Sequence, residues 1–319
     1  MSSPSSVTAV GGSATEEEHS ASSASSASSA SSVGRVIRVL RAFAKMPWLT
    51  KLCCLWLMVV ILTAALADVI PGLPDPNHQG FIFGESKTNE GPSASHWLGT
   101  DNVSRDILSR LIYGARVSLI FSISGVSIGV FIGCVLGSIA GFLKGFVDSV
   151  AMSVVDVMLS FPALVGLLFV STMLESRSLA TLCLITAIFI WPRFTRVGRA
   201  AALSVAGRDF VTAAKAIGTS RRRILLREIL PNVFPAVLAF GLVSMAILII
   251  LESTLSFLGL GVEIPTASWG GMIAQARQDL LINVWPLIWP SVTLIFTVYS
   301  FNNIVDWLRE RVAVRSAAL

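Results

Sequence analysis

The chain has 319 residues, of which 54% are apolar and only 13% charged, and its formal net charge is +5. Soluble domains carry about 25% charged residues, so this composition excludes an ordinary soluble globular protein. Basic residues cluster between long apolar runs, a distribution typical of membrane proteins that argues against a nucleic-acid partner.

The N-terminal segment is rich in serine and alanine and ends in a repeated Ala-Ser-Ser pattern. Such a tract cannot bury enough apolar surface to offset its ordering entropy. We therefore predict a disordered tail over residues 1–45, either inert or regulated by serine phosphorylation.

Apolar runs of about 18 residues or more can cross the hydrocarbon core as helices. The chain contains six candidates, at 52–70, 117–142, 150–173, 179–191, 233–251 and 286–307. The fourth is short and is expected to continue through Pro192. The sequence thus predicts an all-α integral membrane fold with six transmembrane helices. After the tail, the chain is expected to divide into a first helix within 46–70, an insert at 71–115, a core at 116–311 and a C-terminal tail at 312–319.

The basic residues predict the orientation of these spans. If the six alternate, most of the lysines and arginines lie on the side of the termini, in 35–51, 193–227 and 309–315. By the positive-inside rule, both termini are then cytoplasmic and the insert is extracytoplasmic. A cleaved signal peptide ending near Ala67 is the less favoured alternative, since cleavage would invert every later loop against this rule.

The end of the insert predicts a short amphipathic helix over 102–113. Thr100 or Asp101 is the expected N-cap, Val103, Ile107 and Leu111 share a face, and Gly114 is expected to end the helix.

The second span contains glycines at every fourth position. They are Gly125, Gly129, Gly133, Gly137 and Gly141. On a helix this spacing produces a groove without side chains, in which another helix can pack closely.

A polar, basic segment at 193–232 separates the fourth and fifth spans. Within it Phe210, Ala213, Ala214 and Ile217 form one apolar stripe at helical spacing. Gly218 follows where a helix end favours positive φ. Thr219 or Ser220 is then expected to cap a second helix, with Pro231 marking the start of the next span. This helix–turn–helix, within about 200–231, is suited to docking into a groove on a partner protein.

Residues 210–218 (FVTAAKAIG) and 227–232 (REILPN) resemble the coupling, or EAA, loop of binding-protein-dependent ABC importer permeases. Residues 96–119 (HWLGTDNVSRDILSRLIYGARVSL) resemble the segment before the second helix in C-type permeases of the dipeptide/oligopeptide/nickel family. Residues 252–261 (ESTLSFLGLG) with 265–269 are similar to the loop after that family's fifth helix.

The resemblance implies a permease subunit in the inner (plasma) membrane that couples to ATPases. Its implied partners are a homologous B-type permease in a heterodimer, two ABC ATPase subunits and an extracytoplasmic solute-binding protein. The residues it assigns to ATPase coupling are Phe210, Thr212, Ala213, Ala214, Ile217, Gly218 and Pro231. The chain departs from the family pattern at Thr212, where Glu is usual, at Glu228, where His is common, and at Ser104, where Gly is usual. The first departure removes a carboxylate available to the ATPase.

The sequence argues against an enzyme. It contains no Gly-Lys dipeptide and hence no P-loop, so ATP hydrolysis is expected on another chain. Its histidines, at 19, 78 and 96, lie in the tail or the insert, and Cys53, Cys54, Cys134 and Cys183 fall inside apolar spans. We therefore predict no catalytic, cofactor or metal site.

An ion-coupled secondary transporter is the main alternative mechanism. It would need ionisable groups near the middle of the spans, whereas Asp148, Asp156, Glu252 and Asp306 lie toward span ends. Glu252 either lines an external gate, where it could contact a peptide's amino terminus, or simply snorkels to the interface. For the substrate, di- or oligopeptides are our first choice, and a nickel chelate, glutathione or haem are alternatives.

Overall fold

The structure, a computed structural model, describes residues 46–84, 87–174 and 176–317. The chain divides into a unit of residues 1–51 and a main unit of residues 52–319. The predicted tail at 1–45 lies outside the described residues, and the first described helix is α2 (Trp48–Leu66).

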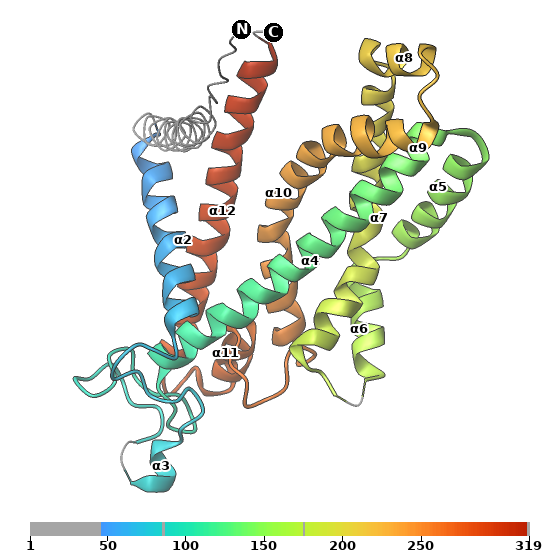
Figure 1. Cartoon of the computed structure of the whole chain (residues 1–319). Helices are drawn as coiled ribbons and strands as arrows, with labels where there is room; N and C mark the ends of the chain where they lie inside the picture. The colour runs from blue at the N-terminus through green and yellow to red at the C-terminus, as the bar shows by residue number, and fades with distance from the viewer. Residues whose placement is uncertain (1–45, 85–86, 175, 318–319) are drawn as a thin grey trace, which may run out of the picture. The chain divides into compact units, whose positions relative to one another are not determined.

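In the described part of the chain, every regular element after α2 is also a helix (Figure 1). In chain order they are α3 (Gly80–Phe83), α4 (Ile107–Leu143), α5 (Gly145–Ser160), α6 (Ala163–Thr172), α7 (Leu179–Ala206), α8 (Asp209–Ala216), α9 (Arg221–Ile224), the π-helical turn η1 (Leu225–Ile229), α10 (Leu230–Phe257), α11 (Trp269–Ala276), the 3₁₀ turn η2 (Arg277–Asp279) and α12 (Trp285–Ala317). The backbone of the predicted C-terminal tail therefore continues α12 as far as Ala317. We call the end of the main unit that carries α8 the α8 end, and the opposite end the α11 end.

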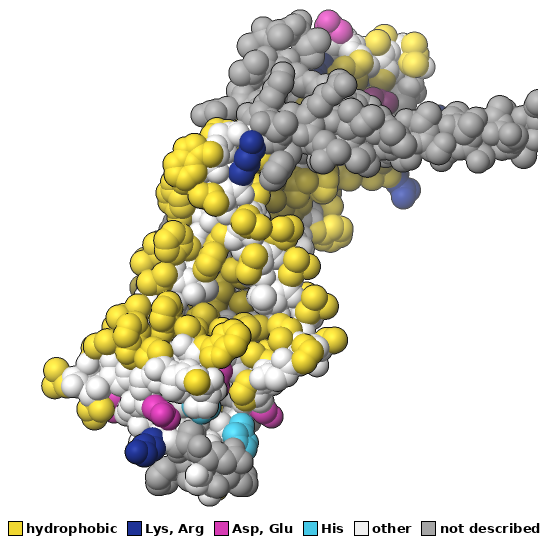
Figure 2. Space-filling model, turned by 90° about the vertical axis from the view of Figure 1, so that its left-hand side faces the viewer, with side chains coloured by type: hydrophobic (Ala, Val, Ile, Leu, Met, Phe, Trp, Pro, Cys, Tyr) yellow, Lys and Arg dark blue, Asp and Glu magenta, His cyan; other side chains and the backbone are white. Residues whose placement is uncertain are grey.

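Five helices are long and apolar enough to cross a membrane: α2, α4, α7, α10 with the turns before it, and α12. The pair α5 and α6 provides a sixth pass if it counts as one broken span. The expected run of the fourth span through Pro192 is confirmed, because α7 extends from Leu179 to Ala206. On the face shown in Figure 2, hydrophobic side chains cover the middle of the molecule and charged ones gather at the end that carries the insert. A continuous apolar band of this kind suits contact with lipid.

The third predicted span is wrong as a single straight helix. It divides into α5 and α6, which meet at an angle of 75°. Phe161 between them is extended (φ −85°, ψ 130°), because the ring of Pro162 disfavours helical geometry at the preceding residue.

The predicted helix at 102–113 is also wrong in its limits. α4 begins at Ile107, and its N-cap is Asp106, whose carboxylate accepts a hydrogen bond from the backbone N–H of Ser109 at 2.7 Å. Gly114 does not end the helix, which continues for 29 residues beyond it to Leu143. A Cβ at Gly114 would lie 3.3 Å from Ser268 and Trp269, so the glycine serves close packing of α11 on α4.

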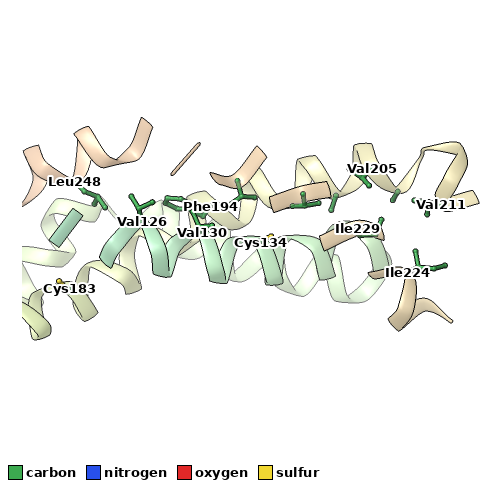
Figure 3. Packing of buried hydrophobic residues seen from close by; sticks show 14 of the residues in the cluster. Val126, Val130, Cys134, Cys183, Phe194, Val205, Val211, Ile224, Ile229 and Leu248 are labelled. Atoms are coloured by element: carbon green, nitrogen blue, oxygen red, sulfur yellow. The ribbon is translucent and has the colours of Figure 1, made fainter. Parts of the chain in front are cut away.

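The largest apolar core lies where α4, α7 and α10 cross, and it continues to the loop at the α8 end (Figure 3). Phe194 is completely buried at its centre, and its ring meets that of Phe240 edge-on, with centroids 5.0 Å apart. α2 packs beside α12, where the indole N–H of Trp56 donates to Thr297 Oγ1 at 3.1 Å. The core thus connects the middle of the helical bundle directly to α8 and α9.

Candidate functional site

The helix α8 is fixed to the body of the protein by one face and exposed on the other. Val211 is fully buried in the main core, and Ile224 of α9 is 1% exposed in the same core. Phe210 is 38% exposed and Ile217, just after the helix, is 82% exposed. Of the predicted stripe, Ala213 is exposed as well, whereas Ala214 is half-buried against the core. The structure therefore exposes three of the four stripe residues, Phe210 and Ala213 on α8 and Ile217 directly after it, beside a buried anchor.

The turn after α8 has the geometry that Gly218 was expected to provide. Its φ is +79°, and its N–H donates to the carbonyl of Lys215 at 3.0 Å. The next N–H, of Thr219, donates to the carbonyl of Ala214 at 3.1 Å. Together these bonds satisfy the last carbonyls of α8. Ser220, rather than Thr219, is the residue that precedes α9.

The second helix of the loop and the fifth span form one continuous helical path. Between α9 and α10 the backbone makes a single π-helical turn, Leu225–Ile229. Pro231 lies in the first turn of α10, at the predicted start of the span. Because proline has no N–H to donate to the preceding turn, a local change of helical register at this point is the expected consequence.

The solvent-facing side of the loop is basic. Arg221, Arg222 and Arg223 are all exposed on α9. Thr212, at the position where relatives were expected to have a glutamate, is exposed and its hydroxyl lies 3.4 Å from the carbonyl oxygen of Arg208. The exposed surface of the loop thus combines apolar side chains with positive charge.

The glycine groove of α4 is occupied by helices of the same chain. A Cβ at Gly129 or Gly133 would collide with Phe194 of α7, and one at Gly137 would lie 2.6 Å from the backbone nitrogen of Arg199. At Gly125 the neighbour is Leu248 of α10. The groove is therefore part of the internal packing of this subunit.

Two ion pairs hold α5 against α7 near the α8 end. Both guanidinium groups come from α7, and the carboxylates come from α5. Arg199 forms a two-point contact with Asp148, and Arg196 contacts Asp156. The first pair is the better shielded, with side chains 32% and 16% exposed against 57% and 62% for the second. Asp148 and Asp156 are thus structural partners of basic residues.

Glu252 does not snorkel to an interface. It is 1% exposed, and its carboxylate accepts hydrogen bonds from Ser118 of α4 at 2.9 Å and from Ser256 at 2.8 Å. Ser268, which precedes α11, donates in turn to the Ser256 hydroxyl at 3.2 Å. The carboxylate therefore joins α4, α10 and α11 inside this subunit, and no surface of it is exposed as a gate.

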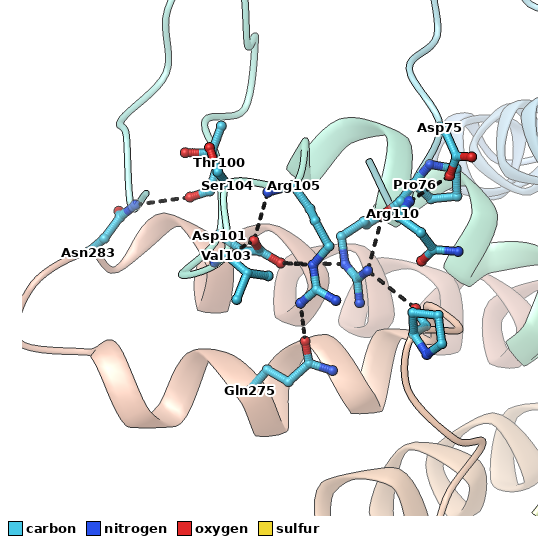
Figure 4. A network of polar contacts seen from close by, with 12 residues as sticks. Asp75, Pro76, Thr100, Asp101, Val103, Ser104, Arg105, Arg110, Gln275 and Asn283 are labelled. Atoms are coloured by element: carbon cyan, nitrogen blue, oxygen red, sulfur yellow. Dashed lines mark hydrogen bonds and ion pairs between the residues drawn. The ribbon is translucent and has the colours of Figure 1, made fainter. Parts of the chain in front are cut away.

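The insert is attached to α11 by a polar network that sequence reasoning missed (Figure 4). Arg105 donates to Asp101 at 2.7 Å and to Gln275 of α11 at 2.7 Å. Arg110, 1% exposed, lies 3.7 Å from the same Asp101 carboxylate and donates to the carbonyl of Pro76 at 3.1 Å. The only sequence signal for this region was the resemblance of residues 96–119 to a family motif. That resemblance did not predict which residues Arg105 and Arg110 contact.

Residues 133–316 match the family model for the inner membrane component of binding-protein-dependent transport systems. That match includes α7, the α8–α9 loop and α10. The chain belongs to this family.

Glutathione transport system permease proteins are similar to the chain over most of its length. The protein from Escherichia coli O1:K1 / APEC is 36% identical over 256 residues, which cover 80% of this chain and 83% of the relative. The protein from Shigella flexneri serotype 5b is 38% identical over the same length and coverage. These similarities extend beyond the family model toward the N-terminus of the chain.

Family membership establishes the general role of the protein. It is the membrane-spanning permease subunit of an ATP-driven importer, and it is a C-type permease, as the sequence motifs predicted. It is not an enzyme. Such a subunit works in the inner membrane with ATPase subunits and a solute-binding protein. Within the described residues, no group of three or more His, Cys, Asp or Glu side chains is arranged to hold a metal ion.

Proposed function

We propose that this subunit imports a small peptide, and that glutathione is the substrate to test first. Relatives that are 36–38% identical over 80% of the chain are named as glutathione permeases. Glutathione is itself a tripeptide, so the peptide substrate expected from the sequence motifs and the relatives' names lead to the same chemical class. The substrate is handed over by the binding protein, and this chain forms half of the translocation pathway beside a homologous B-type permease.

The α8–α9 loop is the ATPase contact in this proposal. The observation that carries it is the combination of a buried anchor with an exposed apolar stripe. Val211 is fully buried while Phe210 and Ile217 are 38% and 82% exposed. A helix anchored in this way transmits movement to the core of the subunit, because Val211 of α8 and Phe194 of α7 belong to one apolar cluster. An exposed apolar stripe on a short helix suits a groove on a partner.

The orientation follows from the same loop. Exposed arginines at α9 lie at the α8 end, and basic residues near membrane-spanning helices favour the cytoplasmic side. With the α8 end inside, both termini are cytoplasmic and the insert faces the binding protein. The ATPases then meet α8 on the side where ATP is available.

The proposal is tested by purifying the complete importer and reconstituting it in proteoliposomes that contain ATP. We expect uptake of labelled glutathione that requires both the binding protein and ATP, and a glutathione molecule in the binding protein as isolated. Uptake that continues without ATP and follows an ion gradient would contradict the proposal. Import of a nickel chelate or haem, with no uptake of glutathione or dipeptides, would refute the peptide assignment alone.

A further inference from the structure

A cavity of about 640 Å³ opens at the α11 end of the main unit. Three parts of the chain line it: Arg177 just before α7, the end of α10 with the loop after it, and α11 with the residues that follow it. Pockets for small ligands typically measure about 300–1,000 Å³, so a tripeptide is within the size range. The cavity is lined by backbone and polar side chains as well as by apolar ones, and the charged residues among its described lining are Arg177, Glu263 and Arg277.

The two arginines of this cavity lack the carboxylate partners that other arginines at the α11 end have within the described residues. Arg105, Arg110 and Arg116 each have a carboxylate partner within 4 Å. Arg177 and Arg277 have none among the described residues, although both line the same cavity. The side chain of Arg177 donates to the carbonyl of Gly259 at 2.7 Å, and within the described part of the chain its guanidinium group forms no ion pair.

Arg277 lies against an aromatic ring and forms no side-chain hydrogen bond with the residues that the structure describes. Its guanidinium carbon lies over the ring of Phe257, 5.5 Å from the centroid. A cation–π contact of this kind does not occupy the N–H groups, which stay available to a ligand. A planar guanidinium binds a carboxylate through two parallel hydrogen bonds, which a lysine cannot reproduce.

Glu263 is the acidic residue among the described residues that line the cavity, and its charge is opposite to that of the arginines. Glu263 accepts a hydrogen bond from the backbone N–H of Arg177 at 2.8 Å, which fixes one of its two carboxylate oxygens, Oε1. The described residues of the cavity therefore offer two positive groups and one negative group. A peptide with two carboxylates and one ammonium group has the complementary set of charges.

The floor of the cavity is tied to the interior of the subunit. Ser256 lines the cavity, and its hydroxyl donates to the buried carboxylate of Glu252. Gly261 packs directly against Ser256, where a Cβ would have no room. Through Glu252 and Ser118 this floor is joined to α4. A ligand in the cavity thus rests on the hydrogen-bonded junction of α4, α10 and α11.

We infer that this cavity, here called the outer arginine cavity, binds an anionic peptide as the peptide leaves the binding protein. Arg277 and Arg177 bind its two carboxylates, and Glu263 binds its ammonium group. The inference rests on the proposed function, because it takes a small peptide as the substrate. It adds a site on the permease itself, with selectivity for peptides that carry two carboxylates.

The test uses the complete importer in proteoliposomes, with the binding protein loaded to the same level in every assay. The probes are glutathione and its glycyl monoethyl ester, which lacks one carboxylate. In Arg277→Gln we expect the rate of glutathione uptake to fall about tenfold, as for the loss of one charged hydrogen-bonding partner. The rate for the ester should fall less, so the ratio of the two rates should decrease relative to wild type.

Lys87→Gln is the matched control, because it removes one positive charge from an exposed position at the same end but outside the cavity. Its uptake rates should equal those of wild type. Equal glutathione uptake in Arg277→Gln, Arg177→Gln and Lys87→Gln would overturn the cavity assignment while leaving the proposed function intact. A wild-type importer that takes up neither probe would refute the proposed substrate, and the peptide site with it. Recovery of each variant in the purified complex at wild-type amounts shows that a lost rate is not lost assembly.

Discussion

Gly198 of α7 crosses Gly133 of α4 so closely that a Cβ on Gly198 would collide with the carbonyl oxygen of Gly133. The two helices therefore meet backbone to backbone, as small-residue motifs allow in membranes. The glycine repeat in α4 accordingly serves the packing of this subunit's own helices.

Gly133→Leu should disrupt this crossing. The new side chain would occupy the space of Phe194 and the α7 backbone, at a cost of about 3 kcal/mol or more. We expect loss of folded subunit from detergent extracts, measured by size-exclusion chromatography after mild heating. Gly207→Ala is the control, because the nearest atoms to a Cβ there are 3.7 Å away. Normal assembly and heat resistance of Gly133→Leu would contradict the packing described.

The carboxylate of Glu252 should be replaceable by an amide but not by a methyl group. In Glu252→Gln the amide can both donate and accept, and the serine hydroxyls can rotate to match it. Glu252→Ala leaves a cavity and unpartnered hydroxyls, which we expect to cost about 2–4 kcal/mol. The measurement is thermal stability of the purified subunit. If Ala is tolerated as well as Gln, the buried carboxylate is not what joins α4, α10 and α11.

The two ion pairs between α5 and α7 should differ in strength. Asp148→Asn removes one side of a two-point contact with Arg199, and we expect a loss of about 1–2 kcal/mol. Asp156→Asn removes a more exposed pair, which should contribute less than about 1 kcal/mol. Thermal stability of the two variants, compared directly, checks the order. Equal losses would mean that exposure does not separate the pairs.

The orientation can be tested by single cysteines in a variant whose four native cysteines are replaced. Thr88 lies in the insert and Ser220 in the α8–α9 loop, and both are exposed. A membrane-impermeant thiol reagent applied to intact cells should label Thr88→Cys and not Ser220→Cys. Lysed cells provide the control, since both sites should then react. Labelling of Ser220→Cys from outside would reverse the proposed orientation.

The sequence was sufficient to predict the helical membrane fold, because each span is a long apolar run and the length requirement is simple. It failed at the third span, where composition stays apolar through Pro162 and only the local backbone constraint on Phe161 reveals the break. It also failed at Glu252, because Ser118, the serine of α4 that donates a hydrogen bond to its carboxylate, lies 134 positions earlier in the chain. Contacts over such separations depend on tertiary packing.

The coupling loop was more predictable because its signals are local. Helical spacing placed Phe210, Ala213 and Ile217 on one stripe, and glycine chemistry placed a positive φ at Gly218. What the spacing could not show is that Ala214 turns partly into the core. A substitution at Ala214 would therefore disturb the subunit's own packing, so Ala213 and Ile217 are the better positions for testing a partner contact.

Ile217→Asp should separate docking from folding. The side chain is 82% exposed, so its loss removes little of the subunit's own packing. In an apolar groove of the ATPase, however, an unpaired carboxylate would be costly. We expect a normally inserted subunit that binds the ATPases poorly and shows neither uptake nor ligand-stimulated ATP hydrolysis.

Two further variants complete the test of the coupling loop, one that alters the turn and one that serves as a control. Gly218→Val keeps the surface but opposes a φ of +79°, at a cost of about 1–2 kcal/mol, and should weaken docking by displacing the turn. Phe146→Asp is the control, because Phe146 is an equally exposed apolar residue (84%) at the α8 end but outside α8. The measurement is ATPase recovery on the purified permease, normalised to permease amount. Full recovery and full transport in Ile217→Asp would place the ATPase contact elsewhere on this chain, whereas equal loss in Phe146→Asp would show that any new charge at this end impairs assembly.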